Sequence, residues 1–385
     1  MTVQDLLHIF DSEERDLSVQ TAQEYAERYL AAEKGCQERI EMAAALTVLL
    51  DDPSRPVRKA IAHVLAASPH APGHIIRCLA QDVDEIAVLA LKSSPLLTDI
   101  ELVDLLAEGS AVAQCAIAER QRLPASVSAA LCEVAHESAC LTLLRNSCAT
   151  ILKSSLQRIA ERFEGDPDLC DELLKLQDLP IPTRYQLLMR VTEDLENHPV
   201  VLERVPEHQR ATFLSDAEDK VVLRLALEAQ DEGLPEFVEH LREKGKLTTR
   251  LLLRAVCCGR LRFFAASLAN LGNLPLPRLC KLLLTVRRAA IQAILRKAGL
   301  PYKSHQAFLL AIDIARQAEA DFSYDLALEE ARMLTETLLG EMQDGVLGAD
   351  EDVTAFLRRF AIDVARLEAR SLLKNTTYLR VTQAA

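Results

Sequence analysis

Arginines and lysines between residues 242 and 303 are the side chains of this sequence whose types and spacing could do chemistry. The segment holds fourteen of them against one acid, Glu243. Arginine suits the bidentate capture of a phosphate or carboxylate. The segment therefore predicts a site for an anionic ligand, such as a nucleotide or second messenger, or for an acidic partner. The candidate residues are Arg250, Arg254, Arg260, Arg262, Arg287, Arg288, Arg296 and Lys297.

A second interpretation of these cations stays open, because the rest of the chain is acidic. The formal charge of the whole chain is −13, and residues 1–241 and 304–353 carry −20 and −10. Runs of charged residues usually lie on exposed helix faces. The arginines could therefore form ion pairs with these acidic segments or face the solvent, without binding a ligand. The acidic remainder would repel a long polyanion, which makes nucleic acid the less favoured partner.

Searches for catalytic and metal motifs fail. The sequence has no glycine-rich phosphate loop, no HExxH and no GxSxG. His63, His70 and His74 approach one another in sequence without an acidic companion, and Glu336 and Glu341 fit a solvated helix face. The ten cysteines form no CxxC pair. We therefore predict no catalytic residue, no metal and no cofactor, and a protein that is not an enzyme.

The elements that must position the basic residues follow from a repeat. Similar residues recur every 26 positions in four columns. These columns are Leu79, Leu105 and Leu131; Ile86, Val112 and Ser138; Leu89, Cys115 and Leu141; and Leu91, Ile117 and Leu143. Self-similarity at this period is typical of a solenoid, in which helical units bury their apolar faces by stacking.

Composition points to helices throughout. Hydrophobic residues make up 49% of the chain, but aromatic residues only 4%, and there is no Trp. Close helix packing suits this composition better than a sheet, which favours β-branched and aromatic side chains. We expect an all-α, HEAT-like α-solenoid of repeats about 26 residues long, followed by a C-terminal helical domain. Each repeat should hold one long and one abbreviated helix.

The turns and cysteines of the repeats carry further expectations. Asp51-Asp52-Pro53 followed by Val57-Arg58 is similar to the turn of HEAT units, where the arginine can link adjacent units. Thr98 and Glu101 have the spacing of a capping box. Five cysteines fall where a small core hydrophobe would pack: Cys78, Cys115, Cys132, Cys140 and Cys148.

Two domains are expected, 1–195 with an N-terminal cap and the repeats, and 216–385 with the basic segment 242–303. The boundary is placed between Glu196 and Ser215, after a break at Pro199. The helices of the second domain should end at Gly233, Gly245, Gly259 and Gly272. The final helix, residues 350–373, is amphipathic and should pack on its own chain or on a second copy, so a homodimer through the C-terminal helices is expected as one outcome.

Several phrases resemble an uncharacterised bacterial domain family with HEAT-like repeats, found mainly in alphaproteobacteria. These phrases are Ala67-Ser68-Pro69 through Leu79 to Asp82, Ser94 to Asp99, Ala116 to Arg120, Leu143 to Asn146, Leu247-Thr248 with Leu251 to Arg254, Phe263-Phe264 and Lys297 to Pro301. The resemblance covers about Leu46 to Pro301 and implies the same helical fold. The family brings no established activity, so the resemblance assigns no functional residue.

The function expected from these patterns is a protein–protein interaction scaffold or adaptor, since solenoids present long binding surfaces. The alternative is a sensor that binds an anionic ligand at the basic helices, and nucleic-acid binding is the weaker alternative. Acids at Asp5, Asp11, Glu13 and Glu14 exclude a signal peptide. No apolar run approaches the ~18 residues that span a bilayer. We therefore expect a cytoplasmic protein without membrane contact.

Overall fold

A computed structural model describes residues 15–285, 288–317, 328–343 and 351–382. Helices account for the regular structure of these residues, and no β-strand occurs among them. The predicted all-α fold is confirmed. Contacts divide the chain into two compact units, one ending at Thr183 and one beginning at Arg184.

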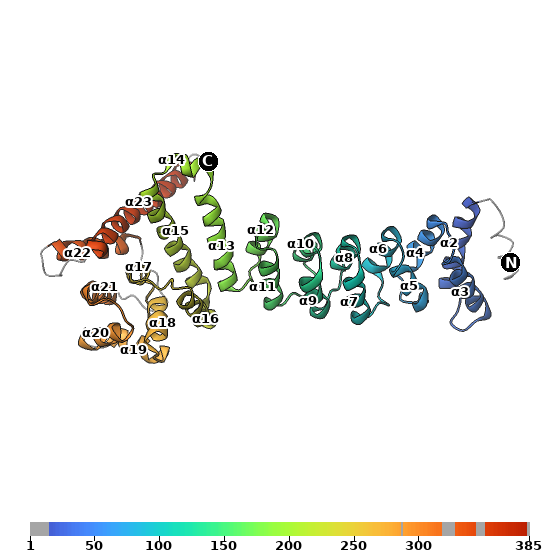
Figure 1. The fold of residues 1–385 in the computed structure, drawn as a ribbon, viewed down its shortest axis with the longest axis horizontal. Helices are drawn as coiled ribbons and strands as arrows, with labels where there is room; N and C mark the ends of the chain where they lie inside the picture. Colours follow the sequence, from blue (N-terminus) through green and yellow to red (C-terminus); the bar gives the residue numbers. More distant parts are fainter. Residues whose placement is uncertain (1–14, 286–287, 318–327, 344–350, 383–385) are drawn as a thin grey trace. The chain divides into compact units, whose positions relative to one another are not determined.

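The first unit is an array of short helices in chain order (Figure 1). They are α2 (Arg15–Ala31), α3 (Gln37–Leu49), α4 (Arg55–Leu65), α5 (Gly73–Ala80), α6 (Asp84–Ser93), α7 (Asp99–Glu108), α8 (Ala111–Ala118), α9 (Ala125–Val134), α10 (Glu137–Arg145), α11 (Lys153–Arg162) and α12 (Pro167–Lys175).

The helices of the first unit stack in two layers. One layer runs α4, α6, α8, α10 and α12, and the other runs α7, α9 and α11, each helix packing on the next in its layer. The pairs α5–α6, α7–α8, α9–α10 and α11–α12 also pack together, while α2 covers α3 and α4 at the N-terminal end. Each repeat thus contacts its neighbours, which is the packing of a solenoid.

The predicted inequality of the two helices in each repeat is wrong. From α5 to α12 the helices have 8 to 10 residues each. A period of 26 residues leaves room for two helices of this length and two tight turns.

Side-chain burial confirms the period but not every column. Leu91, Ile117 and Leu143 are all buried. Val112 and Ser138, by contrast, are exposed. Two columns that the sequence analysis did not name are buried throughout, namely Ile76, Leu102 and Ser128, and Ala80, Leu106 and Cys132. These columns form the core between successive repeats.

Polar contacts join each repeat to the next. The Arg58 Nε atom lies 2.6 Å from Asp82 Oδ2, which confirms the predicted link between units. Lys92 and Glu119 lie 2.7 Å apart, and Arg145 and Glu172 lie 3.0 Å apart. Because these partners stand about one repeat apart in sequence, the pairs fix the register of the stack.

Two arginines bind backbone carbonyls of the preceding repeat. Buried Arg120 donates to the carbonyl oxygens of Leu91 and Ser94 at the end of α6. Arg162 donates in the same way to Cys132 and Ala135 at the end of α9. Each guanidinium satisfies carbonyls that a helix end leaves without an intrahelical donor.

The structure confirms three of the predicted helix caps and differs from the prediction at two others. The Thr98–Glu101 capping box is confirmed. Gly245 and Gly259 have positive φ after α16 and α17, as predicted for C-terminal caps. Gly233 is instead part of helix α16, and Asn273, with φ 47°, caps α18 where Gly272 was expected. Asparagine tolerates the left-handed conformation better than most residues, so it can replace glycine there.

The second unit holds longer and less regular helices. They are α13 (Ile181–Glu196), which begins at the end of the first unit, α14 (Pro199–Arg204), α15 (Glu207–Glu228), α16 (Gln230–Glu243), α17 (Thr249–Cys257), α18 (Leu261–Gly272), α19 (Leu276–Thr285), α20 (Arg288–Lys297), the 3₁₀ helix η1 (Tyr302–Ser304), α21 (His305–Gln317), α22 (Leu328–Gln343) and α23 (Glu351–Thr382). The predicted boundary, between Glu196 and Ser215, lies within the hairpin formed by α13, α14 and α15. The break predicted at Pro199 corresponds to the start of α14.

Helices α17 and α18 form the core of the second unit. Residues 251–257 of α17 are buried without exception, and Phe264 of α18 stacks on Phe308 of α21 with 5.5 Å between ring centroids. Helix α23 packs on α17 and α22 of its own chain through Phe356, Leu357 and Phe360. Its predicted apolar face is therefore buried within the chain for most of its length.

All ten cysteines are free thiols. Cys132 and Cys140 are buried, as expected for core positions, and burial raises the pKa of Cys140 to about 11. The same expectation is wrong for Cys78, on the exposed side of α5, and for Cys148, in the turn after α10.

Within the described ranges, no helix combines the length and the apolar character that crossing a bilayer requires.

Candidate functional site

The basic segment does not form one surface, because its central arginine is buried in an ionic cluster. Arg254 of α17 has only 3% of its side chain exposed. Its Nη2 atom lies 2.6 Å from Asp216, and its Nε atom lies 3.4 Å from Asp219. Both aspartates belong to α15, where their spacing of three residues places them on one helix face.

Arg250 joins the same cluster one helical turn earlier. Its Nε atom lies 3.0 Å from Asp219, and it donates to the backbone carbonyl of Ser215 at 2.7 Å. Burial raises the pKa of Asp219, whereas Arg250 and Arg254 oppose that rise. Two cations against two carboxylates leave the cluster balanced, so it has no spare charge for a ligand.

Aromatic rings close the cluster on its other sides. The Arg254 guanidinium lies 5.4 Å from the ring centroids of both Phe356 and Phe360 of α23. Tyr185 of α13 donates its hydroxyl to Glu218 at 2.6 Å, and Lys246 pairs with the same carboxylate at 2.8 Å. The cluster thus connects α15, α17 and α23, and its arrangement is that of a structural core.

The other predicted residues lie apart from this cluster. Arg260 and Arg262 are half-buried at the start of α18. Arg288 pairs with Asp313 of α21 at 2.6 Å. Arg287 lies outside the described residues. Arg296 and Lys297 are exposed at the end of α20, so of the eight predicted residues these two face solvent most openly without a carboxylate partner in the described parts of the chain.

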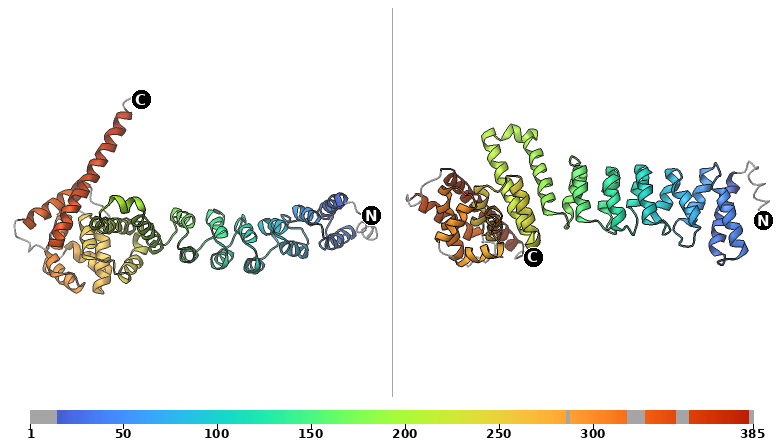
Figure 2. Two further views of the ribbon diagram at one scale, coloured as in Figure 1. Left: turned by 45° about the horizontal axis from the view of Figure 1, so that its top comes forward. Right: turned by 60° about the horizontal axis from the view of Figure 1, so that its bottom comes forward.

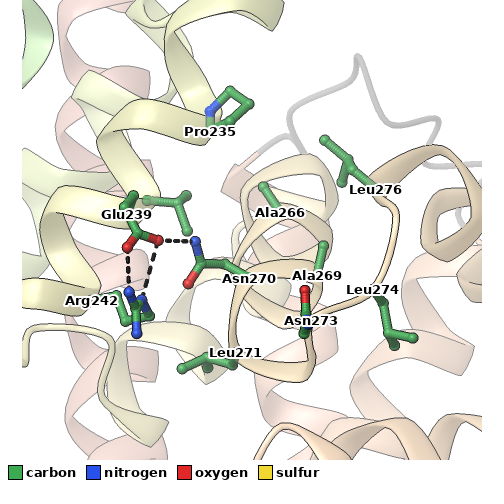
Figure 3. Close-up of a pocket in the computed structure, with 11 residues that line it drawn as sticks. Pro235, Glu239, Arg242, Ala266, Ala269, Asn270, Leu271, Asn273, Leu274 and Leu276 are labelled. Carbon is green, nitrogen blue, oxygen red and sulfur yellow. Dashed lines mark hydrogen bonds and ion pairs between the residues drawn. The ribbon is translucent and has the colours of Figure 1, made fainter.

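A pocket of about 620 Å³ lies between α16, α18 and the start of α19 (Figure 3). Apolar residues, including Ala266, Ala269 and Leu274, line much of it. At one side Asn270 donates to Glu239 at 2.5 Å, and Arg242 pairs with the same carboxylate. These two partners lower the pKa of Glu239 to about 2. The carboxylate is already occupied, so the pocket offers few open polar groups.

A groove of about 740 Å³ lies in the first unit, where the turns after α6 and α8 meet. We call it the inter-repeat groove. Its lining combines both charges with apolar side chains, including Lys92, Pro95, Leu97, Asp99, Glu119 and Arg122. Lys92 pairs with Glu119, whereas exposed Arg122 has no carboxylate within ion-pair distance among the described residues.

Sequence reasoning missed the groove and the acidic partners of Arg250 and Arg254. The net charge of a long segment does not show where Asp216 and Asp219 lie within it. Their spacing of three residues, which places them on one helix face, was a usable signal for an acidic site. The groove arises where Lys92 and Arg122, which stand 30 residues apart, come together through stacking. The repeat period alone does not show that proximity.

Side chains of the metal-binding types do not gather in the described part of the chain: no group of three or more His, Cys, Asp or Glu residues could hold a metal ion there. His74 instead contacts Thr47 at 2.9 Å, and Glu336 pairs with Arg332 at 2.9 Å. These contacts account for two of the side chains that sequence analysis considered.

Comparison with known families identifies the chain. A family model described as "Uncharacterised protein conserved in bacteria (DUF2336)" matches residues 86–348. The chain belongs to the DUF2336 family. The match confirms the predicted kinship with an uncharacterised bacterial family, while the HEAT-like and alphaproteobacterial details stay predictions. The DUF2336 region starts in α6 and includes most of the inter-repeat groove, the charged residues of the buried ionic cluster and the pocket of Figure 3, whereas Phe356 and Phe360 lie beyond it.

Neither a curated protein nor a solved structure matches the chain.

Proposed function

We propose that this DUF2336 protein is a non-enzymatic helical-repeat scaffold of the bacterial cytoplasm that holds a protein partner. The inter-repeat groove is the observation that carries the proposal. Its mixed lining of Lys92, Asp99 and Arg122 beside Pro95 and Leu97 suits an extended polypeptide, which offers apolar side chains and charges together. The free thiols of all ten cysteines agree with a reducing compartment.

Arg122 indicates that the protein partner should carry an acidic side chain. It is exposed in the groove and lacks a carboxylate partner in the described residues, whereas Lys92 is already paired with Glu119. An acidic side chain of the partner would therefore pair with Arg122. Surface pairs of this kind favour the correct partner and its register more than they add affinity.

Photo-crosslinking in bacterial cells tests the groove. With p-benzoylphenylalanine in place of exposed Gln121, which lines the groove, we expect a crosslinked protein adduct. Adding Arg122→Glu places a negative charge opposite the acidic side chain of the partner, so it should lower the adduct yield about tenfold, or about 1.4 kcal/mol of binding free energy. The same probe at Glu108, which is exposed on α7 and outside the groove, is the control. Equal adducts at both positions, or none at Gln121, would contradict the proposal.

The alternative function, a sensor of an anionic ligand, is favoured by a separate observation. Arg296, Lys297 and Lys303 stand close together in the sequence and are all exposed, and Tyr302 is 71% exposed. Residues 244–303 contain no acid that could neutralise these cations locally. The ligand site of this alternative therefore consists of the exposed residues and leaves out buried Arg254.

Thermal unfolding with added nucleotides tests the sensor. A bound nucleotide at a hundredfold of its dissociation constant should stabilise the protein by about 2.7 kcal/mol. The double variant Arg296→Ala/Lys297→Ala should lose this stabilisation, while Arg358→Ala/Arg359→Ala, an exposed basic pair on α23, should keep it. Stabilisation that both variants keep would exclude this site. Retention on heparin at low salt, lost as salt rises, would instead favour nucleic acid.

A further inference from the structure

The pocket of Figure 3 is open because small side chains line one of its walls. Helix α16 packs against α18, and the two lie side by side within the second unit (Figure 2). On the α18 side, Ala266 and Ala269 stand three residues apart and share a helix face. Their methyl groups fill little of the space between the helices, which measures about 620 Å³. Sites for small molecules typically measure about 300–1,000 Å³ and combine apolar walls with few polar groups, so the pocket has the size and lining of such a site.

The charged groups at the edge of the pocket neutralise each other. Arg242 donates to both oxygens of the Glu239 carboxylate, to one of them from Nε at 3.1 Å. Arg242 and Asn270 lower the pKa of Glu239 to about 2, so the carboxylate stays ionised at neutral pH and the ion pair has no net charge. A charged ligand would leave water without meeting an opposite charge that is still unpaired, which is costly. A neutral ligand therefore suits the pocket.

Asn270 leaves one acceptor at this edge without a donor. Its Nδ2 atom donates to Glu239 Oε2 at 2.5 Å. Because an ionised carboxylate can only accept, this bond fixes the orientation of the amide, and Oδ1 points away from Glu239 on the side where Arg242 lies (Figure 3). Oδ1 is buried, and no donor among the described residues bonds to it. An unpaired buried acceptor costs about 1–3 kcal/mol, so this atom indicates a hydrogen-bond donor that a ligand would supply.

We propose that this pocket binds a small, neutral, apolar molecule that carries one N–H or O–H donor. The apolar body of the ligand lies against Ala269 and Leu274, and its donor pairs with Asn270 Oδ1. Glu239 keeps both of its partners, so binding breaks no existing ion pair. The pocket shares no residue with the inter-repeat groove or with the exposed cations of the sensor alternative, so this proposal is independent of both proposed functions.

Two fluorescent probes that differ by one charge test the pocket in the full chain. N-phenyl-1-naphthylamine is neutral and apolar and has one N–H, whereas 8-anilinonaphthalene-1-sulfonate adds an anionic sulfonate to the same rings. The neutral amine should bind with a dissociation constant of about 10 µM, and the sulfonate should bind in the pocket at least about tenfold more weakly. Ala269→Phe, which fills the pocket, should weaken binding of the neutral amine at least about tenfold. Ala289→Phe, at an exposed position of α20, is the matched control and should leave this binding unchanged.

A third molecule, 1-benzylnaphthalene, tests the donor without any substitution in the protein. It has a CH₂ group in place of the N–H of the neutral amine, so it should displace that amine with an affinity about tenfold lower than the affinity of the amine itself. Equal affinities would show that Asn270 Oδ1 takes no part in binding and would overturn the proposal. Three other results would overturn it too: no binding of the neutral amine, unchanged binding by an Ala269→Phe variant that circular dichroism shows to be folded, or a sulfonate that binds as tightly as the amine and is lost in Ala269→Phe.

Discussion

Arg254→Met should lower the free energy of unfolding of the second unit by about 3–5 kcal/mol. Removing the guanidinium leaves Asp216 and Asp219 without their buried partner, and it removes the cation beside the rings of Phe356 and Phe360. An uncompensated buried carboxylate costs far more than a surface pair gains. Denaturant unfolding followed by circular dichroism measures the loss.

Arg288→Met is the matched control for this prediction. Arg288 also pairs with an aspartate at 2.6 Å, but its side chain is 62% exposed. Exposed pairs contribute about 0–1 kcal/mol, so the control should change stability little. Equal losses in the two variants would show that burial does not distinguish them, and the structural role assigned to Arg254 would be wrong.

Ile117→Ala should destabilise the first unit by about 2–5 kcal/mol. Ile117 is fully buried between Leu91 and Leu143, in a column that crosses three repeats. The substitution leaves a cavity at an interface, and repeats in a solenoid depend on their neighbours for stability. Thermal unfolding of the full chain, with hydrogen exchange to assign the transition to the first unit, provides the measurement.

Val112→Ala on the same helix is the control for the cavity. Val112 is 52% exposed, although the 26-residue pattern alone would give it the same status as Ile117. Its substitution should change stability by no more than about 0.5 kcal/mol. A large loss at Val112 together with a small one at Ile117 would mean that the stacking register differs from the one described.

The period of the array was predictable, whereas the burial of individual columns was not. A repeat in the sequence shows that units are equivalent, but helix α8 starts 27 residues after α6, and α10 starts 26 after α8. This one-residue difference rotates Val112 outward, and Ala113 takes the buried position beside the core. Helical phase decides burial, and a shift of a single residue changes it by about 100°.

The candidate site was less predictable than the fold, because charge totals do not show which charges meet. The expectation that the arginines pair with acids fits Arg254, Arg250 and Arg288, whose partners Asp216, Asp219 and Asp313 lie on α15 and α21. The sequence had no comparable signal for the exposed apolar side chains of α13 and α15, such as Leu195 and Phe213. These residues follow ordinary helical spacing, and only the structure shows that they are exposed.

The two units also differ in when they can fold during synthesis. In the first unit the bridging contacts, such as Arg58 with Asp82 and Arg145 with Glu172, join residues less than thirty positions apart. Chains rich in such local contacts fold quickly, so the array can form while the ribosome still makes the remainder. Arg254, in contrast, contacts Phe356 and Phe360, which are more than a hundred residues downstream, so these contacts form only after α23 has been synthesised. The second unit therefore reaches its native core only after α23 has left the ribosome.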